Sequence, residues 1–273
     1  MGKYRELFNL SGRVAVVTGG AGILGGATTA ALADHGAHVA VVDLDADRAS
    51  QVADSLAREY GVPTLGVGCD VSDVDSVAAM TVRVESELGP IRILHNNAAT
   101  KGSDLEKLFA PVEEYDLATW RDIMAVNLDG MFLVSQRIGS LMAERGRGSI
   151  VHTASIYGAT MGPDQRIYEG SEYMGRPINT PPVYSASKGG VVGLTLYLAT
   201  YWASRGVRVN ALTPGGISSG QNDEFNRKYS SRVPLGRMAD VDEVAAGFLF
   251  LASDAASYVT GQNLHVDGGL SAW

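Results

Sequence analysis

Residues 13–25 read RVAVVTGGAGILG, a β-branched run that leads directly into a glycine-rich loop. The run over residues 13–18 predicts a buried parallel strand, and a helix is expected over residues 27–35. Glycines in such a loop permit a tight turn and bring the free N–H groups and positive dipole end of the helix close to a ligand. The stretch therefore predicts a unit that binds the pyrophosphate of a dinucleotide, and a tight turn without a ligand is the alternative.

The rest of the chain repeats this alternation of strand and helix. Further short strands are expected at residues 38–43, 64–69, 91–96, 148–153, 207–212 and 262–266. Helices are expected at residues 47–60, 74–88, about 119–144, about 184–205 and 240–252. The pattern predicts an α/β fold of the Rossmann type, a doubly wound, mostly seven-stranded parallel sheet with helices on both faces. Because no change in composition marks a boundary, residues 1–273 are expected to form a single dinucleotide-binding domain.

Composition and charge favour a cytoplasmic protein whose main partner is neither nucleic acid nor a membrane. Of the 273 residues 45% are hydrophobic, and the net charge of −8 argues against nucleic acid or an anionic membrane as the main partner. Residues 1–10 lack the apolar core of a signal peptide, and no apolar run approaches a membrane span. The single cysteine, Cys69, fits a reducing compartment. The five histidines are dispersed without metal-ligand spacing, so no metal is expected.

The ends of the second and third predicted strands favour NAD as the cofactor. Asp43 ends the second strand, where a carboxylate can accept hydrogen bonds from both ribose hydroxyls of NAD and would repel the extra phosphate of NADP. The next residue is Leu44 rather than an arginine. Asp70 and Val71 follow the third strand, where a carboxylate and an apolar neighbour suit an adenine ring. The alternative for both aspartates is that each caps the helix that follows.

Residues 184–188, YSASK, place a tyrosine and a lysine on one face of a predicted helix. A free tyrosine loses its proton near pH ~10, and a neighbouring ammonium group favours the phenolate, so the pKa of Tyr184 is expected to fall. The phenol could then exchange a proton with a substrate hydroxyl near neutral pH. An accidental pair on a solvated helix face is the alternative.

Together these motifs resemble the short-chain dehydrogenase/reductase family, in its compact single-domain branch, over essentially the whole chain. The matching pieces are the glycine loop 18–25, Asp70, residues 96–99 (NNAA), Asn127, Ser155, residues 184–188, Pro214 with Gly215, and residues 266–269 (VDGG). The resemblance implies a nicotinamide cofactor and hydride transfer. One departure lies in the loop, where the middle glycine is Gly22 and the family more often has it one place later, at the position of Ile23.

By this resemblance, Asn127, Ser155, Tyr184 and Lys188 form the catalytic set. Ser155 would orient the substrate oxygen, Tyr184 would act as general acid/base, and Lys188 would bind the nicotinamide ribose and lower the pKa of Tyr184. Asn127 would hold a water in a proton relay, and Asn97 would support the adenosine end of the cofactor. The implied cofactor contacts are Gly19, Gly22, Leu24, Gly25, Asp43, Leu44, Asp70, Val71, Asn97, Tyr184, Lys188, Pro214, Gly215, Ile217 and Ser219.

The segment 157–183 is longer than the family norm and has no clear period, so a loop over or beside the substrate is expected. Tyr157, Arg166 and Arg176 within it are candidate ligands for hydroxyl or phosphate groups. The phrases SIYG (155–158) and RIYEG (166–170) resemble a subgroup that accompanies legionaminic-acid-type nonulosonic sugar biosynthesis in bacteria. An oligomer contact is the alternative role of the segment.

These observations predict an NAD(H)-dependent oxidoreductase that moves a hydride between nicotinamide and a secondary alcohol or ketone carbon. The expected substrate is a sugar, sugar phosphate or polyol-like molecule. The alternatives are a 3-oxoacyl-carrier reductase, a gluconate-type dehydrogenase and, in a different class, a non-catalytic NAD-binding regulator. The family also implies a homotetramer or homodimer, and the stretches 191–201 and 270–273 fit either such contacts or core packing.

Overall fold

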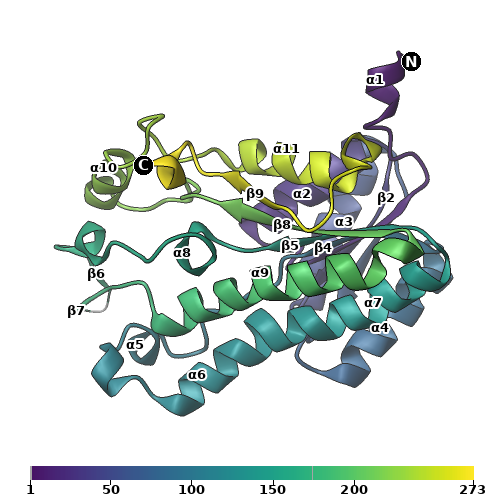
Figure 1. The fold of residues 1–273 in the computed structure, drawn as a ribbon. Helices are drawn as coiled ribbons and strands as arrows, with labels where there is room; N and C mark the ends of the chain where they lie inside the picture. The colour runs from purple at the N-terminus through teal and green to yellow at the C-terminus, as the bar shows by residue number, and fades with distance from the viewer. Residues whose placement is uncertain (1, 174) are drawn as a thin grey trace.

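A seven-stranded parallel sheet organises the computed structural model, which describes residues 2–173 and 175–273 (Figure 1). Its strands are Val14–Thr18 (β1), His38–Asp43 (β2), Thr64–Gly68 (β3), Ile91–Asn96 (β4), Gly148–Thr153 (β5), Val207–Pro214 (β8) and Asn263–Val266 (β9). They lie in the order β3-β2-β1-β4-β5-β8-β9, and every neighbouring pair is parallel. The strand order reverses between β1 and β4, so the expected doubly wound sheet is confirmed.

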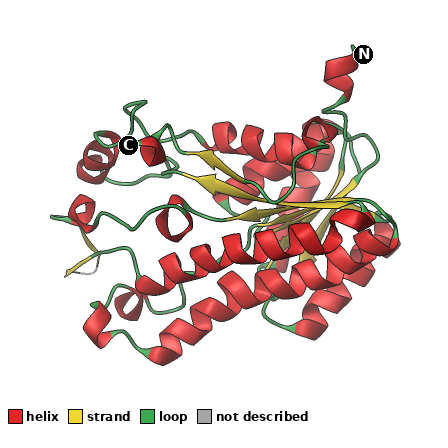
Figure 2. Cartoon of the chain, in the orientation of Figure 1, coloured by secondary structure: helices red, strands yellow, loops and turns green. Residues whose placement is uncertain are grey.

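Helices cover both faces of this sheet (Figures 1 and 2). One face carries α2 (Ile23–Asp34), α3 (Ala46–Tyr60) and α11 (Val241–Ala252), and the other carries α4 (Val74–Glu87), α7 (Met131–Glu144) and α9 (Pro182–Trp202). The other helices are α1 (Lys3–Glu6), α5 (Leu105–Leu108), α6 (Leu117–Met124), α8 (Ile156–Ala159) and α10 (Asp223–Ser230). No helix in the described part of the chain is long and apolar enough to cross a membrane.

The central strands divide the core into two layers. In β1, Val14 and Val16 pack with α4, α7 and α9, whereas Ala15 and Val17 pack with α2, α3 and α11. None of these four side chains is more than 2% exposed. Successive strand side chains point to opposite faces, so a strand covered on both faces must be apolar throughout. This explains why the opening run has no polar alternation.

Two predicted helices differ from the structure for local reasons. The first begins at Ile23 rather than at residue 27, because the glycine at position 25 serves close packing and does not interrupt the helix. The helix expected over residues 119–144 is α6, then a π-helical turn at Ala125–Gly130, then α7. The π-helical turn carries Asn127, and such turns are frequent at functional sites.

The segment 157–183, expected to form a loop, contains several short elements joined by irregular stretches. Helix α8, a 3₁₀ turn at Gln165–Tyr168 and a hairpin of β6 (Glu172–Tyr173) with β7 (Arg176–Pro177) occupy this part of the chain. Its beginning is fixed against α9, because Gly158 has a φ of +94° and a Cβ there would lie 2.0 Å from the carbonyl oxygen of Ser185. The segment extends beyond the carboxyl ends of the strands, on the same side as α10 (Figure 1).

Candidate active site

The loop between β1 and α2 presents free N–H groups at the carboxyl edge of the sheet. Gly22 is the N-cap of α2 and supplies no side-chain hydrogen bond, so no side chain caps this end of the helix. Gly19 has a φ of +63°, and a Cβ there would lie 3.0 Å from the Cα of Ala98. A Cβ on Gly25 would lie 2.0 Å from the carbonyl oxygen of Gly19. Glycine therefore lets the helix pack against the loop, and the uncapped helix end suits a pyrophosphate.

Asn97 joins the ends of the three central strands beneath this loop. Its Nδ2 donates to the carbonyl oxygen of Thr18 at 3.2 Å, and its backbone N donates to Thr18 Oγ1 at 2.9 Å. Thr153 Oγ1 donates to Asn97 Oδ1 at 3.1 Å. The two threonines, at the ends of β1 and β5, are site residues that the sequence analysis missed. For Thr18 the available signal was a hydroxyl residue at the end of an otherwise apolar strand, whereas β5 also contains Ser149 and His152.

Asp43 points at the glycine loop. Its Oδ2 accepts from the backbone N of Ala21 at 3.1 Å, and the N-cap of α3 is Asp45, which accepts from the backbone N of Arg48 at 3.0 Å. The alternative that Asp43 caps the helix is therefore wrong. The neighbouring side chain of Leu44 is 75% exposed at this edge, beside the loop.

Asp70 likewise does not cap α4. That cap is Asp73, which accepts from the backbone N of Ser76 at 2.7 Å. Asp70 is exposed and accepts from the backbone N of Ser72 at 2.9 Å, and Val71 is buried at 7% exposure. An exposed carboxylate thus precedes a buried valine, and the adenine contact stays a prediction.

Ser155, Tyr184 and Lys188 meet where β5 ends and α9 begins. Ser155 follows β5 and caps α8, and its side chain forms a hydrogen bond with Tyr184. Lys188 lies one turn beyond Tyr184 in α9, with its Nζ 5.9 Å from the centre of the tyrosine ring. That Nζ donates to the carbonyl oxygen of Thr153 at 2.8 Å. The predicted serine, tyrosine and lysine therefore share one site.

The expected lowering of the Tyr184 pKa is contradicted in this structure. Burial raises the pKa of Tyr184, and the hydrogen bond with Ser155 opposes that rise. Burial also lowers the pKa of Lys188 to about 8 from an ordinary value of 10.5. Desolvation disfavours both charged forms, and the ammonium group is directed at a carbonyl oxygen. Tyr184 is therefore a protonated phenol at neutral pH, and it can donate a proton.

Asn127 lies in the π-helical turn and is bound to the loop that follows β4. The backbone N of Thr100 donates to Asn127 Oδ1 at 2.7 Å, and Asn127 Nδ2 reaches the carbonyl oxygen of Thr100 at 3.4 Å. The side chain is only 1% exposed. Asn127 thereby fixes the loop after β4 along the wall of the cavity that contains Ser155 and Tyr184.

This cavity has a volume of about 460 Å³. Its polar lining consists of Thr100, Lys101, Asn127, Ser155, Tyr157, Tyr168, Asn179, Thr180, Tyr184, Gln221 and Tyr229. Its apolar walls include Leu108, Phe109, Ile123, Ile178, Phe225 and Met238. Asn179 Nδ2 donates to the carbonyl oxygen of Phe109 at 2.9 Å, so the segment 157–183 and the loop after β4 close the cavity together. Asn179 Oδ1 is buried without a hydrogen-bond partner among the described residues.

The three predicted substrate ligands have different outcomes. Tyr157 lines the cavity, and burial is the largest cause that raises its pKa to about 12. Arg166 does not line the cavity: its side chain is 81% exposed and forms a two-armed ion pair with Asp164 at 2.8 Å. Its role as a substrate ligand is therefore corrected, because the acidic neighbour holds it in solvent. The side chain of Arg176 lies outside the part of the chain that is described.

The turn after β8 closes the remaining side of the cavity. Pro214 ends β8, and Gly215 lines the cavity. Gln221 accepts from the backbone N of Ser219 at 2.8 Å and donates to the carbonyl oxygen of Ile217 at 2.9 Å. The residues expected to border a nicotinamide thus lie together beside the candidate catalytic groups. Within residues 2–173 and 175–273, no three His, Cys, Asp or Glu side chains are placed to hold a metal ion.

The fold and site are those of a class, the nicotinamide-dinucleotide-dependent oxidoreductases. Residues 13–173 match the family model described as short chain dehydrogenase, and residues 170–271 match the model described as enoyl-(acyl carrier protein) reductase. The first match spans more than half of the 273 residues. The chain belongs to the short-chain dehydrogenase/reductase family and is an enzyme that acts on CH–OH groups.

Curated relatives and a solved structure resemble the chain over nearly its whole length. It is 39% identical to D-threitol dehydrogenase of Mycolicibacterium smegmatis over 96% of this chain and 94% of the relative. It is 38% identical to galactitol 2-dehydrogenase (L-tagatose-forming) of Cereibacter sphaeroides over 99% of each chain. The structure of gluconate 5-dehydrogenase from Burkholderia cenocepacia, in complex with NADP and tartrate, is similar with a TM-score of 0.84, 32% identity and 98% coverage of each chain.

Proposed function

We propose that the protein is an NAD(H)-dependent dehydrogenase of a polyol, sugar or sugar phosphate. The observation that carries the proposal is the ring of hydroxyl, amide and ammonium groups around Ser155 and Tyr184 in the cavity. Such groups satisfy several substrate hydroxyls at once, whereas an acyl chain would leave them unpaired. The likeness to a threitol and a galactitol dehydrogenase supports the same substrate class.

The residues of the chain supply proton transfer and positioning in this proposal. The nicotinamide, when bound, accepts or supplies the hydride. Tyr184 exchanges a proton with the substrate oxygen, and Ser155, hydrogen-bonded to the same phenol, orients that oxygen. Lys188 would hold the nicotinamide ribose, and Asn127 would hold a relay water. The raised pKa of Tyr184 makes it a proton donor at neutral pH, which suits reduction, and oxidation requires a higher pH or a bound group that stabilises the phenolate.

The choice of NAD rests on Asp43. Its carboxylate is held at the glycine loop by the backbone N of Ala21, where the adenosine ribose of a dinucleotide would lie. The 2′-phosphate of NADP would meet the negative charge of Asp43 there. The next residue is Leu44, so no arginine at that position compensates this charge. The related gluconate 5-dehydrogenase binds NADP, so the preference must be tested on this chain itself.

The remaining parts of the proposal concern organisation. The whole chain acts as one dinucleotide-binding domain in which the segment 157–183 selects the substrate, in the cytoplasm and as a homotetramer or homodimer. On α9, Val191 is fully buried, whereas Leu196, Tyr197 and Tyr201 are 52%, 63% and 56% exposed. This exposed row, and not the buried face of the same helix, is the part available for subunit contact. At the C-terminus, Leu270 is core at 1% exposure.

The test is turnover of a substrate panel with NAD and with NADP, followed by absorbance of the reduced nicotinamide. D-threitol, galactitol, gluconate and a 3-hydroxyacyl thioester represent the competing classes. We expect polyol oxidation with NAD, and Tyr184→Phe is expected to lower kcat/KM by about 10²–10⁴-fold. Turnover confined to the thioester would favour the acyl-carrier alternative. Unchanged turnover in Tyr184→Phe would contradict the catalytic assignment, and no turnover of any alcohol would favour the regulator.

A further inference from the structure

A second cavity, of about 530 Å³, lies at the amino edge of the sheet, opposite the candidate active site. It lies where β1, β4, β5 and β8 begin, and four arginines line it: Arg13, Arg92, Arg147 and Arg208. Asp254, which follows α11, is the one acidic residue among the described residues of the lining. Four guanidinium groups therefore face one carboxylate, in a protein whose net charge is −8.

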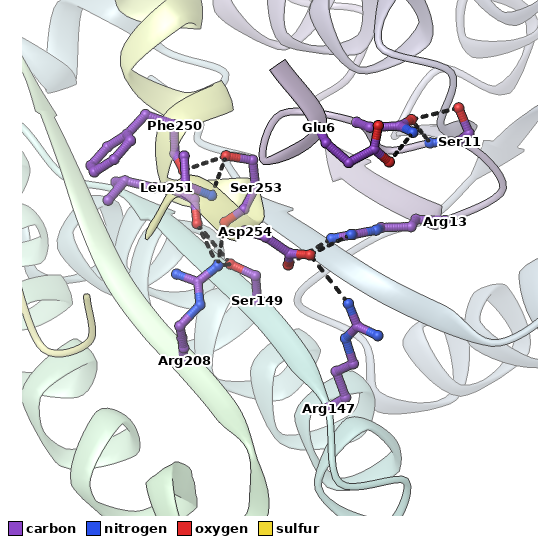
Figure 3. Close-up of polar contacts among 12 residues, drawn as sticks. Glu6, Ser11, Arg13, Arg147, Ser149, Arg208, Phe250, Leu251, Ser253 and Asp254 are labelled. Atoms are coloured by element: carbon purple, nitrogen blue, oxygen red, sulfur yellow. Dashed lines mark hydrogen bonds and ion pairs between the residues drawn. The ribbon is translucent and has the colours of Figure 1, made fainter. Parts of the chain in front are cut away.

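The single carboxylate is shared between two of the arginines (Figure 3). Arg13 donates to both oxygens of Asp254, at 2.9 and 2.6 Å, and Arg147 reaches Oδ2 at 3.4 Å. Arg13 therefore makes the bidentate ion pair with Asp254, and the side chain of Arg147 remains 54% exposed. Asp254 is thus bound mainly by Arg13, and the charge of Arg147 is only partly balanced.

Arg208 is held by uncharged oxygens. Its Nη2 donates to Leu251 O at 2.9 Å, Ser253 O at 3.0 Å and Ser149 Oγ at 3.1 Å (Figure 3). Its Nη1 donates to Val259 O at 3.3 Å. These contacts fix the guanidinium without neutralising it. Burial is the main cause that lowers the pKa of Arg208.

Arg92 has no hydrogen-bond or ion-pair partner among the residues that the structure describes. Its side chain is half-buried, and burial lowers its pKa, with Arg147 and Arg13 adding to the effect. A carboxylate on the neighbouring helix, Glu85, is engaged elsewhere, because both terminal nitrogens of Arg145 bind it. Arg92 is therefore a half-buried cation whose acidic neighbour in the cavity, Asp254, is already bound by Arg13 and Arg147, and an anion in the cavity would balance its charge.

We propose that this cavity is a binding site for a phosphate group, either inorganic phosphate or a phosphomonoester. The planar fork of arginine matches phosphate oxygens in two-armed hydrogen bonds. A dianion placed between Arg92 and Arg147 compensates most of the charge excess left by Asp254. The site lies at the opposite end of the strands from the catalytic residues and is not part of the dinucleotide site.

The test is binding of inorganic phosphate and of phenyl phosphate, which has no alcohol carbon to oxidise, by calorimetry and thermal unfolding. Sodium chloride at matched ionic strength is the reference. Saturable binding is expected, with a rise in Tm of about 5 °C or more at a hundredfold excess over Kd. Equal affinity for the two compounds identifies the phosphate group alone as the ligand, and tighter binding of phenyl phosphate adds a contact from the organic part.

Arg92→Gln and the double variant Arg92→Gln/Arg147→Gln remove the charges with the fewest protein contacts, so the fold and basal turnover should persist. Each loss is expected to weaken binding about tenfold or more. Arg58→Gln, an exposed arginine on α3 outside the cavity, is the matched control and should bind as the wild type does. Undiminished binding in the double variant would place the anion elsewhere, for example at the N-terminus of α2. That result, or no binding beyond the chloride reference, would overturn the proposal.

Discussion

Replacing Lys188 by methionine tests the electrostatics of the site most directly. The lysine is 3% exposed, and its Nζ has the carbonyl oxygen of Thr153 as a partner at 2.8 Å. Burial lowers its pKa from 10.5 to about 8. Methionine keeps much of the side-chain volume without the charge. The variant therefore separates the cost of the buried ammonium group from the packing of α9.

The expected change in the free energy of unfolding follows from the lowered pKa of Lys188. One pKa unit corresponds to about 1.4 kcal/mol, so protonated Lys188 lowers the free energy of unfolding by about 3 kcal/mol at pH 7. The unfolded chain binds the proton more tightly than the folded chain between pH 8 and 10.5, so stability rises with pH across that window. Relative to Lys188→Met, the wild type should gain about 3 kcal/mol from pH 7 to above pH 10.5.

The assay is urea unfolding of the cofactor-free protein at a series of pH values, with the variant and the wild type measured side by side. The other titratable groups are common to both proteins, so their contributions cancel in the difference between the two free energies of unfolding. Lys107→Met, which removes an exposed lysine, is the matched control, and its difference from the wild type should not show the rise expected for Lys188→Met. If the difference between wild type and Lys188→Met is also flat, then Lys188 is not desolvated as described, and the reasoning fails.

The remaining predictions concern the cofactor, the fold of the segment 157–183 and assembly. Asp43→Asn should shift the ratio of kcat/KM for NADPH over NADH upward by about tenfold, and an unchanged ratio would remove the argument for NAD. Gly158→Ala should cost about 2 kcal/mol or more in urea unfolding, because its φ is +94° and the new Cβ meets the carbonyl oxygen of Ser185. Gly162→Ala, where a Cβ meets nothing within 4 Å, is the control, and equal losses in both would refute the packing argument. Tyr201→Glu should reduce the oligomer measured by light scattering, and a monomeric wild type would contradict the assembly proposed.

The amino-acid sequence by itself determined the parallel sheet and most of the site. Hydrophobic runs without alternation predict strands buried on both faces, and glycines between a strand and a helix predict the cofactor loop. Both features can be read from the sequence because each depends only on neighbouring residues. The positions of Ser155, Tyr184 and Lys188 follow from the same order of elements, since parallel strands end at one edge.

Only the tertiary structure decided the charge states and the contacts that depend on distant residues. Burial raises the pKa of Tyr184, although its lysine neighbour suggested the reverse, because desolvation is set by every element packed around the phenol. Arg166 is held in solvent by Asp164. Arg13 and Arg208 are far apart in the sequence and share a cavity because their strands belong to one sheet. Periodicity along the chain reports which way a side chain faces, but the packing of separate strands and helices decides which charges meet and how much water they lose.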